Sequence, residues 1–464
     1  MGRKIMGAEN KIYQQDVSVG KLLVFVFPTI IAMLLASLYS IVDGVFVSNV
    51  GGTEAFAAIN QVSPLFMIVA SLGFMFGTGG TALISKLQGE GDSEKAKQVF
   101  SLLTVTLIII AVVASVLLAL FFYNLLDVLG ATEDMMPFCE AYSAIIIPCI
   151  PLFMLQFYFQ SILTCAGKAG LGLVFTICAG VTNVVGDAVL VGIVAQGDPV
   201  KAVQGAALAT GAGLVVGGLL PLIYFLAKNK SSLRLVRPSK EFKFIGKACG
   251  NGISEFLSNV SASVVNAVYN SIFLYMIGSK GVSAYGTVSY VNTIFCAIMM
   301  GFTVGVAPLI AYSFGEGNKE RLKSLYKKSL AIVLLISIIA TVVIELLATP
   351  LASIFSHGDE ELLWITVTGL HIFTLSFIVK GFPTFGSGFF TALNNGLVSG
   401  LIATLRTLVF SLAAIIVVPL IFIAIYGTAV AGYYGVWFSV VGAEVCALIM
   451  TFIFLRRNKK KYGY

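Results

Sequence analysis

Long, uninterrupted apolar runs dominate the chain, with short polar or glycine-containing turns between them. Residues 102–122 (LLTVTLIIIAVVASVLLALFF) are typical of these runs. A transmembrane helix needs about 20 mainly apolar residues, whereas a strand of an outer-membrane barrel has about 10 residues of alternating polarity. The pattern therefore predicts an all-α integral membrane protein with twelve transmembrane helices. We place them at residues 21–48, 57–86, 98–123, 137–163, 169–196, 201–227, 243–277, 282–313, 325–348, 361–391, 397–425 and 428–455.

One long polar and basic stretch divides these helices into two sets of six. It has the sequence KNKSSLRLVRPSKEF and is interpreted as a linker between two lobes. The resulting division is a cytoplasmic N-terminal segment at 1–20, an N-lobe at 21–227, the linker at 228–242, a C-lobe at 243–455 and a basic cytoplasmic tail at 456–464.

The basic residues lie almost entirely on one side of the predicted bilayer. With the first residue inside, we assign 26 of the 29 Lys and Arg residues, Arg406 among them, to cytoplasmic segments. Only Lys201 and Lys280 fall outside, and Lys380 lies within a helix. Because cytoplasmic loops carry an excess of Lys and Arg, we expect a multi-pass plasma (inner) membrane protein with both termini in the cytoplasm. This distribution also explains the net charge of +7 without a nucleic-acid partner.

The two sets of helices show an internal repeat at a constant offset of 226 residues. Residues 77–100 (GTGGTALISKLQGEGDSEKAKQVF) and 303–326 (TVGVAPLIAYSFGEGNKERLKSLY) are identical at eight of 24 positions, where chance would give one or two. Both halves begin on the same side, so the repeats are parallel. Parallel repeats with a substrate site between them are typical of transporters.

The composition excludes several classes of function. Hydrophobic residues make up 58% of the chain and charged residues 11%, against about 25% charged residues in soluble domains. Two histidines argue against a haem or zinc enzyme, and the phosphate-binding motif GxxxxGK[ST] is absent from the sequence. We therefore expect a monomeric protein that is not an enzyme and has no cofactor or resident metal. Its expected partners are small organic molecules and the lipid bilayer.

A group of polar residues within the first-half helices has the composition of a cation site. A charge in a span costs about 2.5–3.5 kcal/mol on insertion scales, so each one needs a specific reason. Asp43 lies in the first helix, about five residues from its predicted outer end, and Asn183 and Asp187 share a face of the fifth helix. With Thr210 of the sixth helix they offer oxygen ligands suited to H⁺ or Na⁺. The alternatives are an interfacial acid at Asp43, a hydrogen-bonded helix clamp at Asn183 and Asp187, and a Thr210 hydroxyl bonded to its own backbone.

Four further residues are candidates for a gate or a substrate pathway. Glu255, near the start of the seventh helix, is either a gate or second ion site or an acid at the interface. Lys380 of the tenth helix is either part of a structural ion pair or a substrate-pathway residue. Gln156 and Gln160 share a face of the fourth helix, where they either line a cavity or bond neighbouring helices. Glu444 is placed near a helix end and interpreted as structural.

The chain resembles the MATE family, the multidrug and toxic compound extrusion transporters, over essentially its whole length. The first-helix acid with the fifth-helix N-x-x-x-D pattern is the most specific part of this resemblance. The segments that carry it are FPTIIAMLLASLYSIVDGVFVSNVGG, GTGGTALISKLQGEGD, TNVVGDAVLV and GVAPLIAYSFGEGN. The resemblance implies an N-lobe cation site at Asp43, Asn183, Asp187 and Thr210. Some branches of the family also have acids deep in the seventh and tenth helices, where this chain has Glu255 and Lys380.

The function that the resemblance implies is a secondary antiporter. It exports amphipathic, cationic drugs or other toxic organic compounds in exchange for H⁺ or Na⁺. The main alternative is a related flippase for lipid-linked or polysaccharide precursors, which we expect to have several basic residues in its central groove. A major-facilitator transporter would need a basic loop between its second and third helices, but this chain has KLQGEGDSEKAK there.

Overall fold

The structure, a computed structural model, describes residues 18–129, 132–229, 231–356, 359–427 and 429–464. Every regular element in these ranges is a helix, and twelve helical segments are long and apolar enough to cross a membrane, which confirms the predicted fold class. The elements are α1 (Val19–Gly89), α2 (Ser93–Leu129), α3 (Met136–Cys165), α4 (Ala169–Gly186), η2 (Asp187–Val194), α5 (Pro199–Leu214), η3 (Val215–Leu219), α6 (Leu220–Leu226), α7 (Lys243–Ile277), α8 (Ser279–Gly315), α9 (Lys319–Ser356), α10 (Glu360–Ala392), α11 (Gly396–Thr404), η4 (Leu405–Phe410), α12 (Ser411–Tyr426) and α13 (Ala429–Tyr462).

Short connections between the spans are set by glycine turns and side-chain caps. The long α1 contains two spans, which join at Gly52, where the backbone φ of +82° favours glycine. At the start of α5 the Asp198 carboxylate accepts hydrogen bonds from the Lys201 and Val200 amides at 3.2 and 3.0 Å. These bonds hold the pKa of Asp198 below its usual range. Such caps let consecutive spans reverse direction within a few residues.

The two halves of the chain build two separate cores. The first core combines α1, α2 and α3 with apolar residues of the following helices, and the second combines α7 to α13. Leu22 and Val26, at the beginning of α1, belong to the second core, whereas Val47 further along the same span belongs to the first. The first span therefore bridges the two halves.

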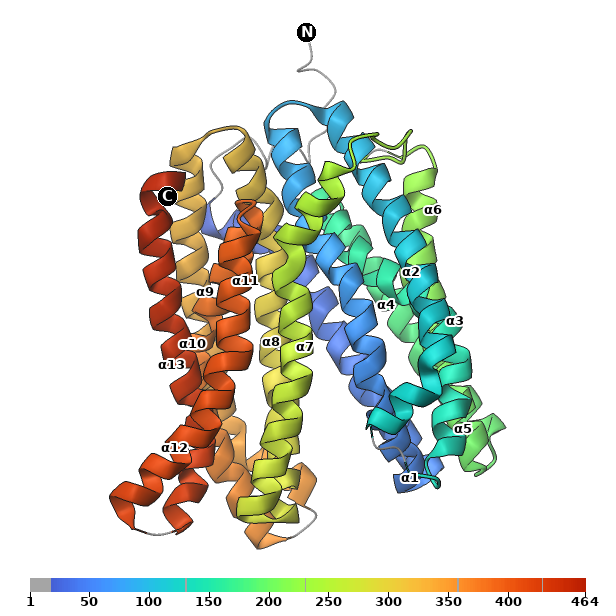
Figure 1. Ribbon diagram of the computed structural model, residues 1–464, viewed down its shortest axis with the longest axis vertical. Coiled ribbons are helices and arrows are strands. Elements are labelled where there is room, and N and C mark those ends of the chain that lie inside the picture. The colour runs from blue at the N-terminus through green and yellow to red at the C-terminus, as the bar shows by residue number, and fades with distance from the viewer. Residues whose placement is uncertain (1–17, 130–131, 230, 357–358, 428) are drawn as a thin grey trace.

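The halves are close together at one end of the molecule and spread apart toward the other. Figure 1 shows the helices of both halves converging at the end where α13 terminates, while α12 and α7 diverge from α1 and α5 at the opposite end. Leu22 shares a core cluster with Leu455 and Tyr462, so α1 begins at the end where α13 finishes. The linker follows the same end, where the Ser239 amide donates to the Gln98 carbonyl at 3.1 Å.

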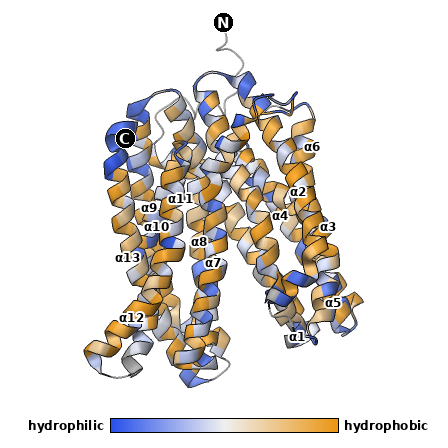
Figure 2. Cartoon of the chain, in the orientation of Figure 1, coloured by the Kyte–Doolittle hydropathy of each residue, from blue (hydrophilic) through white to orange (hydrophobic). Residues whose placement is uncertain are grey.

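The outer helices present apolar side chains to the surroundings. Leu120, Leu346 and Ile425 are each more than 65% exposed. Figure 2 shows apolar colour along most of the helix lengths and polar colour concentrated near the helix ends. An exposed apolar surface of this extent requires a lipid environment.

Two ends of the predicted domain map differ from the structure. The last helix continues to Tyr462 through most of the segment that we expected to be a tail, and Tyr464 is buried with its hydroxyl donating to the Leu455 carbonyl at 2.8 Å. Aromatic packing of Tyr464 on Tyr326 and Phe389 explains this end. At the other end, residues 1–17 of the predicted N-terminal segment lie outside the described residues.

Candidate functional site

The four residues predicted to form a cation site come together in the first half. Asp43 of α1 and Asp187 at the start of η2 lie with their carboxyl groups side by side, within hydrogen-bonding reach of each other. Asn183, one turn before Asp187, donates its Nδ2 to the Thr210 hydroxyl of α5 at 3.4 Å. Three helices far apart in sequence thus contribute to one polar group, which we name the N-lobe site.

Asp43 lies deeper in its helix than the sequence indicated. The first span runs to Gly52, nine residues beyond Asp43, because the apolar run continues through VGG instead of ending at residue 48. At a rise of 1.5 Å per residue the carboxylate is about 13 Å from the helix end. This depth is incompatible with an acid that simply reaches the interface.

Small residues bring α4 and α5 close enough to form the N-lobe site. A Cβ on Gly186 would lie 2.7 Å from the Ala209 Cβ, and a Cβ on Gly213 would lie 3.1 Å from the Ala179 carbonyl oxygen. The close approach places Asn183 against Thr210. Directly after Gly186 the chain becomes π-helical, a wider turn that is frequent at functional sites.

The N-lobe site has more hydrogen-bond acceptors than donors. Asp43 Oδ1, Asn183 Oδ1 and both carboxylate oxygens of Asp187 are buried and accept no hydrogen bond from a donor group. Asp187 is fully buried, and neither carboxylate has an ion-pair partner among the described residues. Buried acceptors are normally satisfied, so a site with four open oxygens is suited to a proton or a small cation.

Two tyrosines belong to this region and were not predicted. The Tyr142 hydroxyl of α3 shares a hydrogen bond with Thr210 and lies close to both carboxylates. The Tyr39 hydroxyl accepts a hydrogen bond from Gln156 Nε2 at 3.1 Å. Nothing in the apolar run AYSAIIIP distinguishes Tyr142 from a core tyrosine, because its role depends on helices that are distant in sequence.

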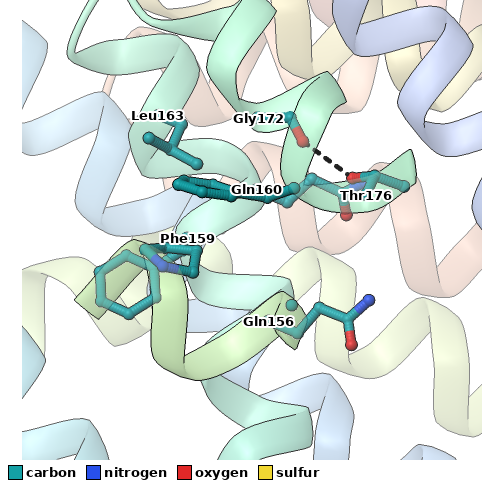
Figure 3. A pocket seen from close by; sticks show the side chains of 9 residues that line it. Gln156, Phe159, Gln160, Leu163, Gly172 and Thr176 are labelled. Atoms are coloured by element: carbon teal, nitrogen blue, oxygen red, sulfur yellow. Dashed lines mark hydrogen bonds between the residues drawn. The ribbon is translucent and has the colours of Figure 1, made fainter. Parts of the chain in front are cut away.

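The two predicted glutamines of α3 line a small hollow beside the N-lobe site. Gln156, Gln160, Phe159, Leu163, Gly172, Phe175, Thr176, Gly217 and Pro221 form its walls. Figure 3 shows both glutamines near the turn in which the Thr176 hydroxyl donates to the Gly172 carbonyl. Gln156 also bonds Tyr39, so its two predicted roles, cavity lining and interhelical bonding, occur together.

The second half contains a buried network of opposite charges. Arg406 donates from Nε and Nη2 to the Glu444 carboxylate at 3.0 and 3.2 Å, and from Nη1 to the Thr384 hydroxyl at 2.7 Å. Lys380 donates to Asn292 Oδ1 at 2.6 Å and lies 3.8 Å from Glu444. We name Lys380, Arg406 and Glu444 the C-lobe network. Lys380 therefore has the carboxylate partner that its structural interpretation requires.

The positions of three predicted charges need correction. Arg406, which we counted as cytoplasmic, lies ten residues into the span that starts at Gly396. Glu444 is twelve residues into the last span and not near its end. Apolar flanks hid both positions, and only their mutual contact shows that each is compensated within the membrane.

Glu255 lies within α7 and not at its start. It is twelve residues, or about 18 Å, beyond Lys243, so the interfacial interpretation is wrong. Its carboxylate interacts electrostatically with Arg406, and this interaction connects it to the C-lobe network. The structure thus separates the predicted residues into the N-lobe site, the hollow beside it, and a group of Glu255 and Lys380 in the other half.

Comparison with known proteins gives matches over the whole chain. The MatE family model matches residues 28–189 and again residues 256–417, once in each half. Multidrug export protein MepA of Staphylococcus saprophyticus is 28% identical over 463 residues, covering 98% of both chains. MepA of Staphylococcus haemolyticus is 25% identical over 452 residues, covering 97% of this chain and 96% of the relative.

Solved structures share the fold at lower identity. A MATE protein in complex with MaL6 superimposes with a TM-score of 0.90 at 21% identity, covering 98% of this chain and 99% of that one. A MOP superfamily transporter from Pyrococcus furiosus, described as having a binding pocket of reverse polarity, superimposes with a TM-score of 0.88 at 22% identity and covers 99% of both chains. The repeated family match and these superpositions confirm the predicted two-repeat architecture.

Proposed function

The chain belongs to the MatE family of membrane transporters, and from this premise we propose that it is a secondary antiporter that exports amphipathic organic cations. The coupling ion is H⁺ or Na⁺, and it binds at Asp43, Asn183, Asp187 and Thr210. The proposed location is the plasma membrane, with both termini in the cytoplasm and the monomer as the working unit.

The excess of buried acceptors in the N-lobe site is the observation that supports this proposal. Two adjacent carboxylates with no cationic neighbour repel each other in a low-dielectric environment. A shared proton or a bound Na⁺ removes that repulsion, and Asn183 Oδ1 and the Thr210 hydroxyl supply further oxygen ligands for Na⁺. An exported cation competes for the same negative charge, which gives the exchange its direction.

The first span is the element that transmits ion binding to the rest of the molecule. Its early residues Leu22 and Val26 pack in the second core, and Asp43 faces the N-lobe site. Pro28 lies between them and removes a backbone hydrogen bond, so the span bends there at low cost. Neutralising Asp43 lets the span repack against α4 and η2 and changes the shape of the N-lobe cavity.

The second half gives little support to the flippase alternative. Such a protein is expected to carry several unpaired basic residues in its groove. Lys380 and Arg406 both contact Glu444, and Glu255 lies within electrostatic range of Arg406, so the two positive charges are balanced by two carboxylates. A balanced network does not attract polyanionic precursors.

Transport by the Asp43→Asn variant tests the proposal. Purified protein is reconstituted in liposomes, an H⁺ or a Na⁺ gradient is imposed separately, and movement of a fluorescent organic cation is followed. We expect transport with one of the two gradients in the parent protein and none in the variant. Asp134→Asn, which changes an exposed acid between spans, is the matched control and should transport normally.

Substrate-induced ion release makes the assignment sharper. The parent protein in detergent should release H⁺ or Na⁺ when the organic cation is added, and Asp43→Asn should not. Full transport and full ion release by a well-folded Asp43→Asn protein would remove this residue from the mechanism.

A further inference from the structure

The two halves meet through backbone contacts that only glycine permits. A Cβ on Gly79 of α1 would lie 2.0 Å from the Ala248 carbonyl oxygen of α7. A Cβ on Gly252 of α7 would lie 1.9 Å from the Met75 carbonyl oxygen of α1. These distances are far below any real Cβ contact, and the opposing atoms belong to backbone that cannot rotate away.

A second pair of such contacts joins the ends of α1 and α8. A Cβ on Gly89 would lie 2.2 Å from the Tyr312 carbonyl oxygen, and one on Gly315 would lie 2.1 Å from the Lys86 carbonyl oxygen. Each glycine therefore faces the backbone one turn before the other glycine. Nearby, the Asn394 side chain of the second half donates to the Ala82 carbonyl of the first at 3.2 Å.

The contacts obey the internal repeat. The offset of 226 residues converts Lys86 into Tyr312 and Gly89 into Gly315, so the two contacts at the ends of α1 and α8 are copies of each other. The same offset converts the Gly79–Gly252 contact into a contact between Gly305 and Val26, where a Cβ on Gly305 would lie 3.0 Å from Val26 Cβ. This interface was duplicated with the fold, whereas the N-lobe site was not.

All these contacts lie toward one end of the molecule. They involve the final turns of α1 and α8 and the first turns of α1 and α7, where the two halves converge in Figure 1. A small apolar cluster of Met33, Phe74, Ala297 and Val304 joins the halves next to them. Under the proposed orientation this is the cytoplasmic end.

We propose that Gly79, Gly89, Gly252 and Gly315 form a two-fold seal that closes the cytoplasmic side of the transporter. Contacts between halves must separate when access changes sides, whereas contacts within a half must not. A methyl group on a seal glycine therefore penalises only the state in which this end is closed. The population shifts toward the state open to the cytoplasm, and the fold of each half is unaffected.

A distance measurement across the seal tests this inference. Spin labels are attached at Glu94→Cys and Glu320→Cys, two exposed positions related by the 226 offset at the starts of α2 and α9. The seven native cysteines are replaced by serine. Gly89→Ala and Gly315→Ala should both shift the label distances to longer values, and to a similar extent because the two contacts are symmetric.

Three further variants serve as controls. Gly246→Ala in α7 places its methyl where no atom lies within 4 Å and should leave the distances unchanged. Gly73→Ala directs a Cβ to 2.1 Å from the Met154 carbonyl within the first half, so it should lower thermal stability without opening the seal. Gly305→Ala meets the Val26 side chain at 3.0 Å and should give a smaller shift, which keeps the test decisive if the tighter variants do not fold.

Unchanged distances in folded Gly89→Ala, Gly315→Ala and Gly305→Ala proteins would overturn the proposal, and so would an equal shift in Gly246→Ala. The labels report geometry without substrate or ion. The result is therefore independent of whether Asp43 couples transport, although the assignment of this end to the cytoplasm rests on the proposed function.

Discussion

The N-lobe site and the C-lobe network occupy the two halves of a duplicated fold but have opposite electrostatic character. In the first half, Asp43 and Asp187 face each other with no cationic partner among the described residues. In the second half, Glu444 is held by Arg406 and Lys380 through geometry that satisfies it fully. An uncompensated acidic pair requires an ion from outside the chain, whereas a compensated network requires none.

The repeat itself shows how the halves diverged. At the offset of 226 residues Asp43 corresponds to Tyr269, Asn183 to Val409 and Asp187 to Ala413, so no copy of the N-lobe site exists in the second half. Both fifth spans of the repeat still contain a π-helical segment, η2 beginning at Asp187 and η4 containing Arg406. The duplication thus preserved a local irregularity of the helix and changed the charge placed on it.

The largest effect is expected from removing the acidic pair. Asp187→Asn should abolish gradient-driven export as Asp43→Asn does, because both carboxylates hold the same ion. The Asp43→Asn/Asp187→Asn double variant should be hardly worse than either single variant, since residues that act as one unit are not additive. Liposome transport measures all three. Additive losses would show that the two acids act separately.

Disrupting the C-lobe network should affect stability before transport. Glu444→Gln leaves two buried cations without their carboxylate and should lower the free energy of unfolding by about 3–5 kcal/mol. Lys380→Met should cost less, about 1.5–3 kcal/mol, because Arg406 still neutralises Glu444. Thermal unfolding in detergent ranks the two variants. If Lys380→Met proved the more damaging, Lys380 and not Arg406 would be the main partner of Glu444.

A smaller effect is expected from the tyrosine that completes the N-lobe site. Tyr142→Phe removes one hydroxyl next to Thr210 and should weaken binding of the coupling ion about fivefold, which corresponds to about 1 kcal/mol for one hydrogen bond. Titration of substrate-induced ion release against ion concentration measures this shift. Unchanged ion affinity would limit Tyr142 to a packing role.

The smallest effect is expected from Glu255→Gln. Its carboxylate lies in the range of Arg406 in the other half, so export should slow while its dependence on the imposed gradient is retained. The comparison between the halves would be reversed by one outcome, in which Glu255→Gln eliminates ion release and Asp43→Asn preserves it. The coupling site would then lie in the second half.

The sequence predicted the fold because membrane insertion is governed by local hydrophobicity. Each apolar run is long enough to identify a span by itself, and the basic stretches and the 226-residue repeat indicated two parallel halves. The N-lobe site was predictable for a similar reason, since Asn183 and Asp187 share a helix face and Asp43 is an acid in an otherwise apolar run.

Only the tertiary structure decided which charges are compensated. Arg406 and Glu444 are 38 residues apart on different spans, and their pairing depends on how α10, η4 and α13 pack. The same is true of Tyr142 at the N-lobe site. The glycine contacts between halves also have no distinct local signature, because a glycine that packs within a half and one that meets the opposite half look alike in sequence. Local hydrophobicity therefore determined the spans, and long-range packing determined which polar groups are open and which helices must separate.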